Sequence, residues 1–183
     1  MNISSTSVRA SIAAFFCAVL AGCASLEAPS DRYEGRFAVT ALQDGKPASA
    51  NGTFHLSRTT SEFSLRLTST FGVRIAEVTY DGTSAVITAL NADPVSDADP
   101  QTALERATGL RIPVQKILAW LDGAPAEPRT EVIPVREDTV GFVEDGWVVT
   151  IRNPGEIPRL ITASYPEENL RVKLVLSEKE TRP

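Results

Sequence analysis

The sequence has very few of the side chains that bind metals or serve as catalytic bases and thiol nucleophiles. Its 183 residues include one histidine, His55, and two cysteines, Cys17 and Cys23. Without a second histidine or a free thiol, no familiar zinc site or histidine-based triad can be recognised. No glycine-rich phosphate-binding motif is present. We therefore expect no enzymatic activity, no catalytic residue, no metal and no cofactor, and we expect His55 to be a surface residue.

The sequence also lacks an excess of positive charge. Its formal net charge is −5, and this becomes −6 if Arg9 is removed with an N-terminal signal. Nucleic-acid-binding proteins usually carry a basic patch, because most of their affinity comes from contacts with phosphates. The composition therefore argues against nucleic acid, and against a broad anionic membrane surface, as a partner. Any attachment to a membrane is expected to come from a lipid.

The N-terminus has a short apolar run that ends in a recognisable cleavage motif. Arg9 precedes an apolar stretch over residues 10–21, which is too short to span a membrane stably and is typical of a signal peptide. Leu20-Ala21-Gly22-Cys23 then has the form of a bacterial lipobox. We predict cleavage after residue 22 and lipidation of Cys23, whose acyl chains would anchor the protein stably. The alternative is an ordinary secretion signal with an incidental cysteine.

The remaining 161 residues fit a single domain. Cys17 leaves with the signal and Cys23 carries lipid, so no disulfide and no cysteine metal site is expected. Residues 23–31 are short, small and polar, as expected of a lipidated tether, and residues 32–183 form the predicted domain. We expect a monomer.

Most of the predicted domain alternates between apolar and polar residues, as half-buried strands do. The alternation predicts strands over residues 33–40, 53–57, 62–68, 73–80, 84–90, 140–143, 147–152, 159–165 and 169–177. Asp81-Gly82 and Asp145-Gly146 are tight-turn signals between consecutive strands. The sequence therefore predicts a meander of antiparallel strands with one polar and one apolar face.

Two short helices interrupt the strands. Asp99 can cap a helix that begins at Pro100 and ends at Gly109. A second helix is expected to begin at Pro113 and end at Gly123, with an apolar stripe that includes Leu118 and Leu121. A proline-rich loop with Pro125, Pro128 and Pro134 follows. Strands, two helices and further strands predict an α+β fold in which the helices lie against an antiparallel sheet.

Several blocks of this sequence resemble the LolB family of outer-membrane lipoprotein receptors. The most specific are Thr108-Gly109-Leu110-Arg111-Ile112-Pro113-Val114 and Leu118-Ala119-Trp120-Leu121-Asp122-Gly123-Ala124-Pro125. Tyr33 to Phe37, Gly52 to Phe54, Leu65 to Gly72, Gly146 to Val149 and the strand pair from Pro158 to Leu176 are also similar. Two features depart from the family pattern, since Leu56 stands where many relatives have a tryptophan and the last strand lacks the usual late tryptophan.

The resemblance implies an open, half-closed β-barrel with short helices as a lid over an apolar cavity. The cavity would receive the acyl chains of lipoproteins brought by the periplasmic carrier LolA, for insertion into the inner leaflet of the outer membrane. The partners implied are therefore a LolA-type carrier, cargo acyl chains and outer-membrane phospholipid. The protein would be lipid-anchored in the outer membrane of a Gram-negative bacterium and face the periplasm. Ala24 and Ser25 after Cys23 also resemble the outer-membrane sorting pattern.

The turn at Phe71 and Gly72 is a candidate membrane-insertion loop. In the family the matching position is an exposed apolar residue, usually leucine, that passes cargo into the membrane. Here Thr70 and Phe71 stand where the family has Pro-Leu. Two placements of Phe71 are compatible with the sequence, one folded back onto the core and one projecting into solvent. The resemblance favours the second.

Apolar side chains on the dry faces of the predicted strands and helices are candidates for the acyl-chain cavity. Each could instead fill an ordinary core. The candidates are Phe37, Phe54, Phe63, Leu65, Leu118, Trp120, Leu121 and Trp147. A function from another class is also open, in which the protein is a structural lipoprotein that scaffolds an envelope complex without binding lipid. A continuous apolar cavity under the helices would favour the carrier function, whereas a filled space would favour the scaffold.

Overall fold

The computed structural model describes residues 30–43, 45–154 and 157–182. The predicted signal peptide over residues 1–22, Cys17 and Cys23 lie outside these ranges, as does most of the predicted tether. Their assignments therefore remain predictions. Among the described residues, no helix is both long enough and apolar enough to cross a membrane.

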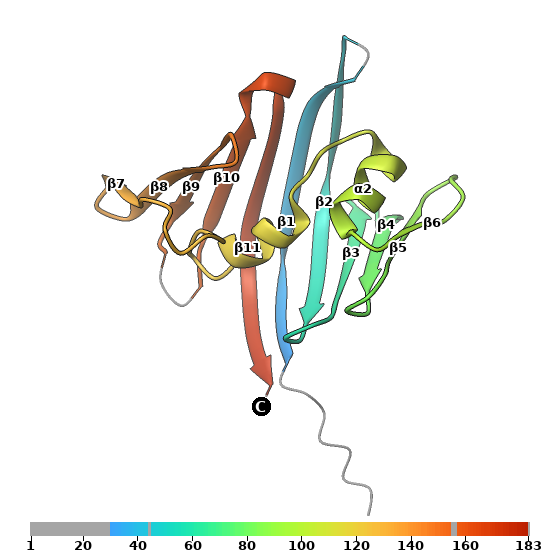
Figure 1. Ribbon diagram of the computed structural model, residues 1–183, viewed down its shortest axis with the longest axis horizontal. Coiled ribbons are helices and arrows are strands. Elements are labelled where there is room, and N and C mark those ends of the chain that lie inside the picture. Colours follow the sequence, from blue (N-terminus) through green and yellow to red (C-terminus); the bar gives the residue numbers. More distant parts are fainter. Residues whose placement is uncertain (1–29, 44, 155–156, 183) are drawn as a thin grey trace, which may run out of the picture.

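One antiparallel sheet of eleven strands contains every strand of the described residues. The strands are β1 (Ser30–Gln43), β2 (Lys46–Arg58), β3 (Phe63–Ser69), β4 (Arg74–Tyr80), β5 (Ala85–Ala89), β6 (Val95–Asp97), β7 (Ile133–Arg136), β8 (Thr139–Glu144), β9 (Trp147–Arg152), β10 (Leu160–Tyr165) and β11 (Leu170–Arg182). Their spatial order is β6-β5-β4-β3-β2-β1-β11-β10-β9-β8-β7. The sheet curves but does not close, because β6 and β7 form its two free edges (Figure 1). The predicted α+β fold with an open antiparallel sheet is confirmed.

The two helices lie on the segment that joins one free edge of the sheet to the other. This segment leaves the edge strand β6, forms α2 (Pro100–Thr108) and α3 (Val114–Trp120), and enters the opposite edge strand β7. A single 3₁₀ turn, η2 (Pro166–Glu168), separates β10 from β11. Because the connection has to cross from edge to edge, it passes over one face of the sheet (Figure 1). We call residues 100–122, which contain α2, α3 and the two residues after α3, the lid.

The central strands are longer than the alternation predicts. β1 was expected over residues 33–40, yet it pairs along nearly its whole length with both β2 and β11. This continuous pairing satisfies backbone groups beyond the apolar stretch and so extends the strand. Gly35 sits at a bulge in the β1–β11 ladder. A Cβ atom added there would lie 2.2 Å from the Val175 carbonyl oxygen, so this close approach requires glycine.

The helix ends follow the predicted signals, with small shifts. The Asp99 side chain caps α2 by accepting a hydrogen bond of 2.9 Å from the Thr102 backbone N–H. Gly109 ends α2 in the left-handed conformation, with φ of 71°. α3 differs from the expected range because Pro113 has ψ of 78°, which places it outside the helix as the N-cap. Leu121 forms the C-cap of α3, and Gly123 follows in a turn.

One prediction about the loop after the lid is wrong. Pro134, expected in a proline-rich loop, lies within β7. This edge strand pairs with β8 on one side and, among the described residues, with no strand on the other. Proline has no N–H to donate, and an edge strand tolerates this loss because it needs hydrogen bonds on a single side. The short strands β6 and β7 were both missed because neither has enough residues to show a clear alternation.

Candidate functional site

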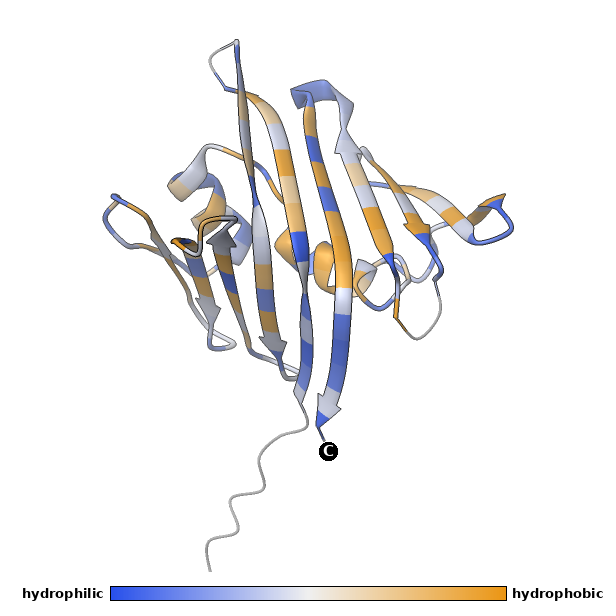
Figure 2. Ribbon diagram, turned by 180° about the vertical axis from the view of Figure 1, so that it is seen from behind, coloured by the Kyte–Doolittle hydropathy of each residue, from blue (hydrophilic) through white to orange (hydrophobic). Residues whose placement is uncertain are grey.

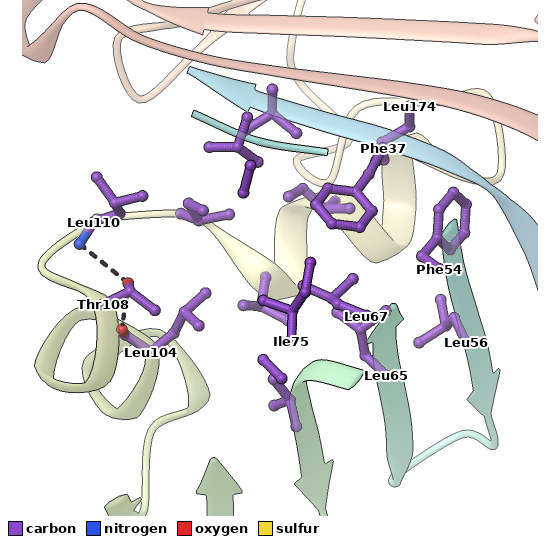
Figure 3. A pocket seen from close by; sticks show the side chains of 18 of the residues that line it. Phe37, Phe54, Leu56, Leu65, Leu67, Ile75, Leu104, Thr108, Leu110 and Leu174 are labelled. Carbon is purple, nitrogen blue, oxygen red and sulfur yellow. Dashed lines mark hydrogen bonds between the residues drawn. The ribbon is translucent and has the colours of Figure 1, made fainter. Parts of the chain in front are cut away.

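An apolar cavity of about 190 Å³ lies between the lid and the sheet (Figure 3). Its sheet wall includes Phe37, Phe54, Leu56, Leu65, Leu67 and Ile75. Its lid wall includes Leu104, Leu110, Ile112, Ile117, Leu118 and Leu121. Two residues of β11, Val172 and Leu174, and two small residues, Ala50 and Ala76, also line it. The cavity therefore occupies the half of the sheet from β11 to β4, on the side that the lid covers.

Among the described residues, Thr108 is the only one with a polar side chain that lines the cavity, and its hydroxyl is already satisfied. The hydroxyl donates a hydrogen bond of 2.7 Å to the Leu104 carbonyl and accepts one of 3.2 Å from the Leu110 N–H (Figure 3). A polar group placed in this cavity would lose its hydrogen bonds to water and gain none. The cavity is therefore suited to an apolar ligand.

The eight candidate cavity residues fall into two groups. Phe37, Phe54, Leu65, Leu118 and Leu121 line the cavity. Phe63, Trp120 and Trp147 do not line it and pack elsewhere in the core. Phe63 lies against Tyr80 with ring centroids 5.5 Å apart. The two tryptophans lie 6.1 Å apart and extend an aromatic cluster to Phe142 and Tyr165 in the other half of the sheet.

A buried carboxylate explains why Trp120 turns away from the cavity. The Trp120 indole N–H donates a hydrogen bond of 2.9 Å to Glu144, whose side chain is only 3% exposed. Glu144 also accepts a hydrogen bond of 2.7 Å from the Glu127 N–H. These bonds tie the end of α3 and the segment after it to β8. Side chains, including Trp120, therefore fill the space over β8, β9 and β10, whereas the cavity lies over the strands from β11 to β4.

Leu67, Ile75, Leu104, Leu110 and Ile117 line the cavity but were not among the candidates. Leu67 shares the alternation of Leu65, and Leu104 and Ile117 lie on the apolar faces of the two predicted helices. The periodicity of the sequence therefore could have identified these three residues as candidates for the cavity lining. Ile75 lies beside a bulge in the β3–β4 ladder and Leu110 in the connection between the helices, so periodicity does not place them.

Polar side chains tie the end of α3 to one end of the sheet. The Arg58 guanidinium donates a hydrogen bond of 2.7 Å to the Leu118 carbonyl and forms an ion pair with Asp122. Asp122 also accepts hydrogen bonds from the Tyr33 hydroxyl at 2.5 Å and from the Lys179 ammonium at 3.3 Å. We call Tyr33, Arg58, Asp122 and Lys179 the latch. It joins the lid to β1, β2 and β11 at the end of the sheet where β1 begins.

The latch shifts the titration of its own groups. Partial burial alone would raise the pKa of Asp122, but hydrogen bonds from Tyr33 and Arg58 outweigh it and hold this pKa below its usual range. Burial and the hydrogen bond to Asp122 raise the pKa of the Tyr33 hydroxyl. Tyr33 therefore stays neutral and Asp122 stays ionised at neutral pH. The ionised Asp122 carboxylate, which accepts hydrogen bonds from Tyr33, Arg58 and Lys179, therefore holds the latch together.

We expect the latch to weaken in acid. A carboxyl group with a lowered pKa in the folded state stabilises that state above its unfolded pKa of about 3.9, and the stabilisation is lost as the pH falls through the folded value. Asp122→Asn should therefore lower the free energy of unfolding at pH 7 and lower it less at pH 3. Urea unfolding at the two pH values measures this. Hydrogen exchange at residues 114–120 should also quicken in the variant at pH 7.

Asp93→Asn is the matched control, because Asp93 is an exposed turn residue outside the latch. It should change neither the stability nor the exchange of α3. An equal loss of stability for Asp122→Asn at pH 7 and pH 3 would show that the ionised carboxylate does not hold the lid.

The β3–β4 turn holds an aromatic side chain in solvent. Phe71 is 93% exposed, so it does not fold back onto the core. The turn around it is closed by hydrogen bonds, including Gly72 N–H to the Ser69 carbonyl at 3.0 Å and Ser69 N–H to the Val73 carbonyl at 2.7 Å. Gly72 has φ of 80°, a conformation that glycine adopts without strain. Val73, two residues after Phe71, is 49% exposed, so the turn presents two exposed apolar side chains.

Within the part of the chain that the structure describes, no group of three or more His, Cys, Asp or Glu side chains could hold a metal ion. His55 is half exposed and lies 3.1 Å from Glu34 on the face of the sheet away from the lid. It lies on β2 between the lining residues Phe54 and Leu56, with its side chain on the opposite face of the strand.

Known proteins match the chain over most of its length. The family described as "Outer membrane lipoprotein LolB" matches residues 31–178. An outer-membrane lipoprotein LolB from Bordetella petrii is 30% identical over 183 residues, which cover 93% of this chain and 92% of that protein. One from Ralstonia nicotianae is 28% identical over 148 residues, covering 73% of this chain and 71% of that protein. A solved LolA superfamily protein from Nitrosomonas europaea is 7% identical, with a TM-score of 0.33 over 84% of this chain and 87% of that one.

Proposed function

The chain belongs to the LolB family of outer-membrane lipoproteins, and from this premise we propose that its cavity takes up the acyl chains of the lipoproteins it receives. Family membership makes the protein a lipid-anchored receptor of the outer membrane that acts in lipoprotein localisation. The ligand, the donor and the route into the membrane are the proposed part. Cargo arrives from a LolA-type carrier, enters the cavity under the lid and leaves for the inner leaflet of the outer membrane.

The apolar cavity is the observation that carries this proposal. Each buried methylene of an acyl chain is worth about 0.8 kcal/mol, so exposing two or three chains to water costs tens of kcal/mol. A lipoprotein that leaves its carrier therefore needs an apolar container, and a cavity whose one polar side chain is already satisfied meets this need. A scaffold that bound no lipid would have no reason to leave this space unfilled.

The size of the cavity implies that the lid moves when cargo enters. A cavity of about 150 Å³ lined by aliphatic and aromatic residues accommodates benzene. The cavity here, at about 190 Å³, is only slightly larger and is smaller than a complete acyl chain. Entry of a whole chain therefore requires the lid to rise from the sheet. The latch is the polar contact that this movement has to break.

Two further residues have roles in the proposed cycle. Lipidation of Cys23 anchors the receptor, and the short segment from Cys23 to Ser30 keeps the folded body near the bilayer. Phe71 contacts the bilayer and passes the cargo into it. Its exposure and the hydrogen-bonded turn that supports it favour this role over a place in the core.

A transfer experiment tests the function. A purified LolA-type carrier loaded with a labelled lipoprotein is mixed with this protein, and the label bound to each is measured after separation. We expect the label to move to this protein, since a ligand moves toward the state with which its interaction is more favourable. If the label stays on the carrier under conditions in which another LolB accepts it, the proposed uptake is wrong.

A further inference from the structure

The face of the sheet away from the lid concentrates positive charge. Register places three adjacent cross-strand rows on this face, and each strand contributes alternate residues to it. The first row runs from Arg136 and Arg152 through Val175 and Arg36 to Arg74. The next two rows contain Lys173 and Arg171. Figure 2 views the sheet from this side.

No carboxylate lies in these three rows among the described residues. The other members are threonine, serine, asparagine, alanine, glycine, valine, leucine and isoleucine. We call Arg36, Arg74, Arg136, Arg152, Arg171 and Lys173 the basic field, and all six are exposed. Glu34 and Glu178 face each other nearer the start of β1, outside the rows. The field is therefore locally positive although the chain has a net charge of −5.

Most of this charge is not neutralised by neighbouring side chains. Arg74 forms an ion pair of 3.0 Å with Glu77, which also pairs with Arg66. The other five cations form no ion pair with any residue that the structure describes. Unpaired cations spread over neighbouring strands attract a surface with many negative charges more than they attract a single anion.

We propose that the basic field docks on the anionic phospholipid headgroups of the membrane to which the protein is anchored. The length of the tether permits this docking, because the seven Cα–Cα steps from Cys23 to Ser30 span at most about 25 Å. The side chains between the cations are mostly small and neutral, and the rows contain no aromatic residue of the kind that anchors a protein interface. A headgroup layer needs no such anchor.

Continuity with the β3–β4 turn supports the same partner. The first row ends at Thr68 and Arg74, the two residues that flank the turn carrying Phe71. Basic residues beside an exposed apolar group are typical of proteins that bind at the membrane interface. The field would therefore hold the sheet against the bilayer with Phe71 at its margin. The inference rests on the proposed function only for the membrane location and for the role of Phe71.

Binding to vesicles tests the field without cargo. The described residues form one sheet with one core, so the mature chain from residue 23 is used with Cys23→Ser to remove the anchor. Cosedimentation is measured with phosphatidylcholine vesicles and with vesicles that also contain phosphatidylglycerol. We expect stronger binding to the anionic vesicles. Each lost cation should lower that binding about fivefold, and added salt should weaken it.

The paired variant Arg36→Glu with Lys173→Glu should lose at least twenty-fivefold in binding to anionic vesicles. The control pair Lys46→Glu with Arg129→Glu changes the net charge equally at exposed residues outside the field and should bind almost as wild type. Thermal unfolding confirms that both pairs are folded.

Equal binding of wild type to both kinds of vesicle would overturn the proposal, and so would equal losses in the two pairs. If the field pair binds vesicles normally but no longer accepts cargo from the carrier, the field contacts an acidic protein and the proposal is wrong. Vesicle binding that depends on the field, together with no cargo uptake by wild type, would instead reject the proposed function alone.

Discussion

Phe71→Glu is expected to stop the release of cargo into a bilayer while leaving the fold and the uptake of cargo intact. Phe71 is almost fully exposed, so its replacement removes no core contact. Burying a phenylalanine side chain in an apolar phase yields about 1.5–3 kcal/mol, and a carboxylate would make insertion unfavourable. The release rate should therefore fall about ten- to a hundredfold or more. Transfer of a labelled lipoprotein from the loaded receptor to liposomes measures this rate.

Two variants serve as controls for Phe71→Glu. Phe71→Leu keeps an apolar side chain and should retain most of the release rate. Val86→Glu places a carboxylate on another exposed apolar residue, 41% exposed on β5 and outside the rows of the basic field, and should have little effect. If Phe71→Glu releases cargo at the wild-type rate, the turn does not act in insertion. If Val86→Glu slows release as much, the effect is one of net charge.

Ala50→Trp is expected to block the uptake of acyl chains. Ala50 lies on β2 and lines the cavity, which is somewhat larger than a cavity of about 150 Å³ that accommodates benzene and so has room for an indole ring. The new side chain would therefore occupy most of the space that the cargo needs. We expect transfer of cargo from the carrier to fall at least tenfold. The melting temperature should change little, because Ala50 is only partly buried and the cavity can take the ring.

Ser49→Trp is the matched control, because Ser49 is the preceding residue and lies on the opposite face of the same strand. It should accept cargo as wild type does. Normal uptake by Ala50→Trp would show that the acyl chains bind elsewhere. The melting temperatures of both variants are measured first, so that uptake is compared only between folded proteins. The pair therefore separates filling of the cavity from a general effect of tryptophan on β2.

Local patterns in the sequence predicted the elements well because those patterns report local forces. Alternation along residues 33–40 identified which side chains of β1 face inward, and Asp99 and Gly109 marked the ends of α2. The same patterns could not separate the cavity from the core. Trp120 and Leu121 are neighbours on one helix, yet Leu121 lines the cavity and Trp120 bonds to Glu144. That difference depends on a carboxylate 24 residues away.

The sequence by itself determined the family, the predicted lipid anchor and the two-faced strands, since each follows from residues close together in the chain. Only the tertiary structure decided which apolar residues line the cavity and which pack against other side chains in the core. It also showed that an acidic chain carries a positive surface, because pairing of β1 with β11 brings Arg36 beside Lys173 from the far end of the sequence. Composition averages charge over the whole chain, whereas strand register assigns each charge to a face.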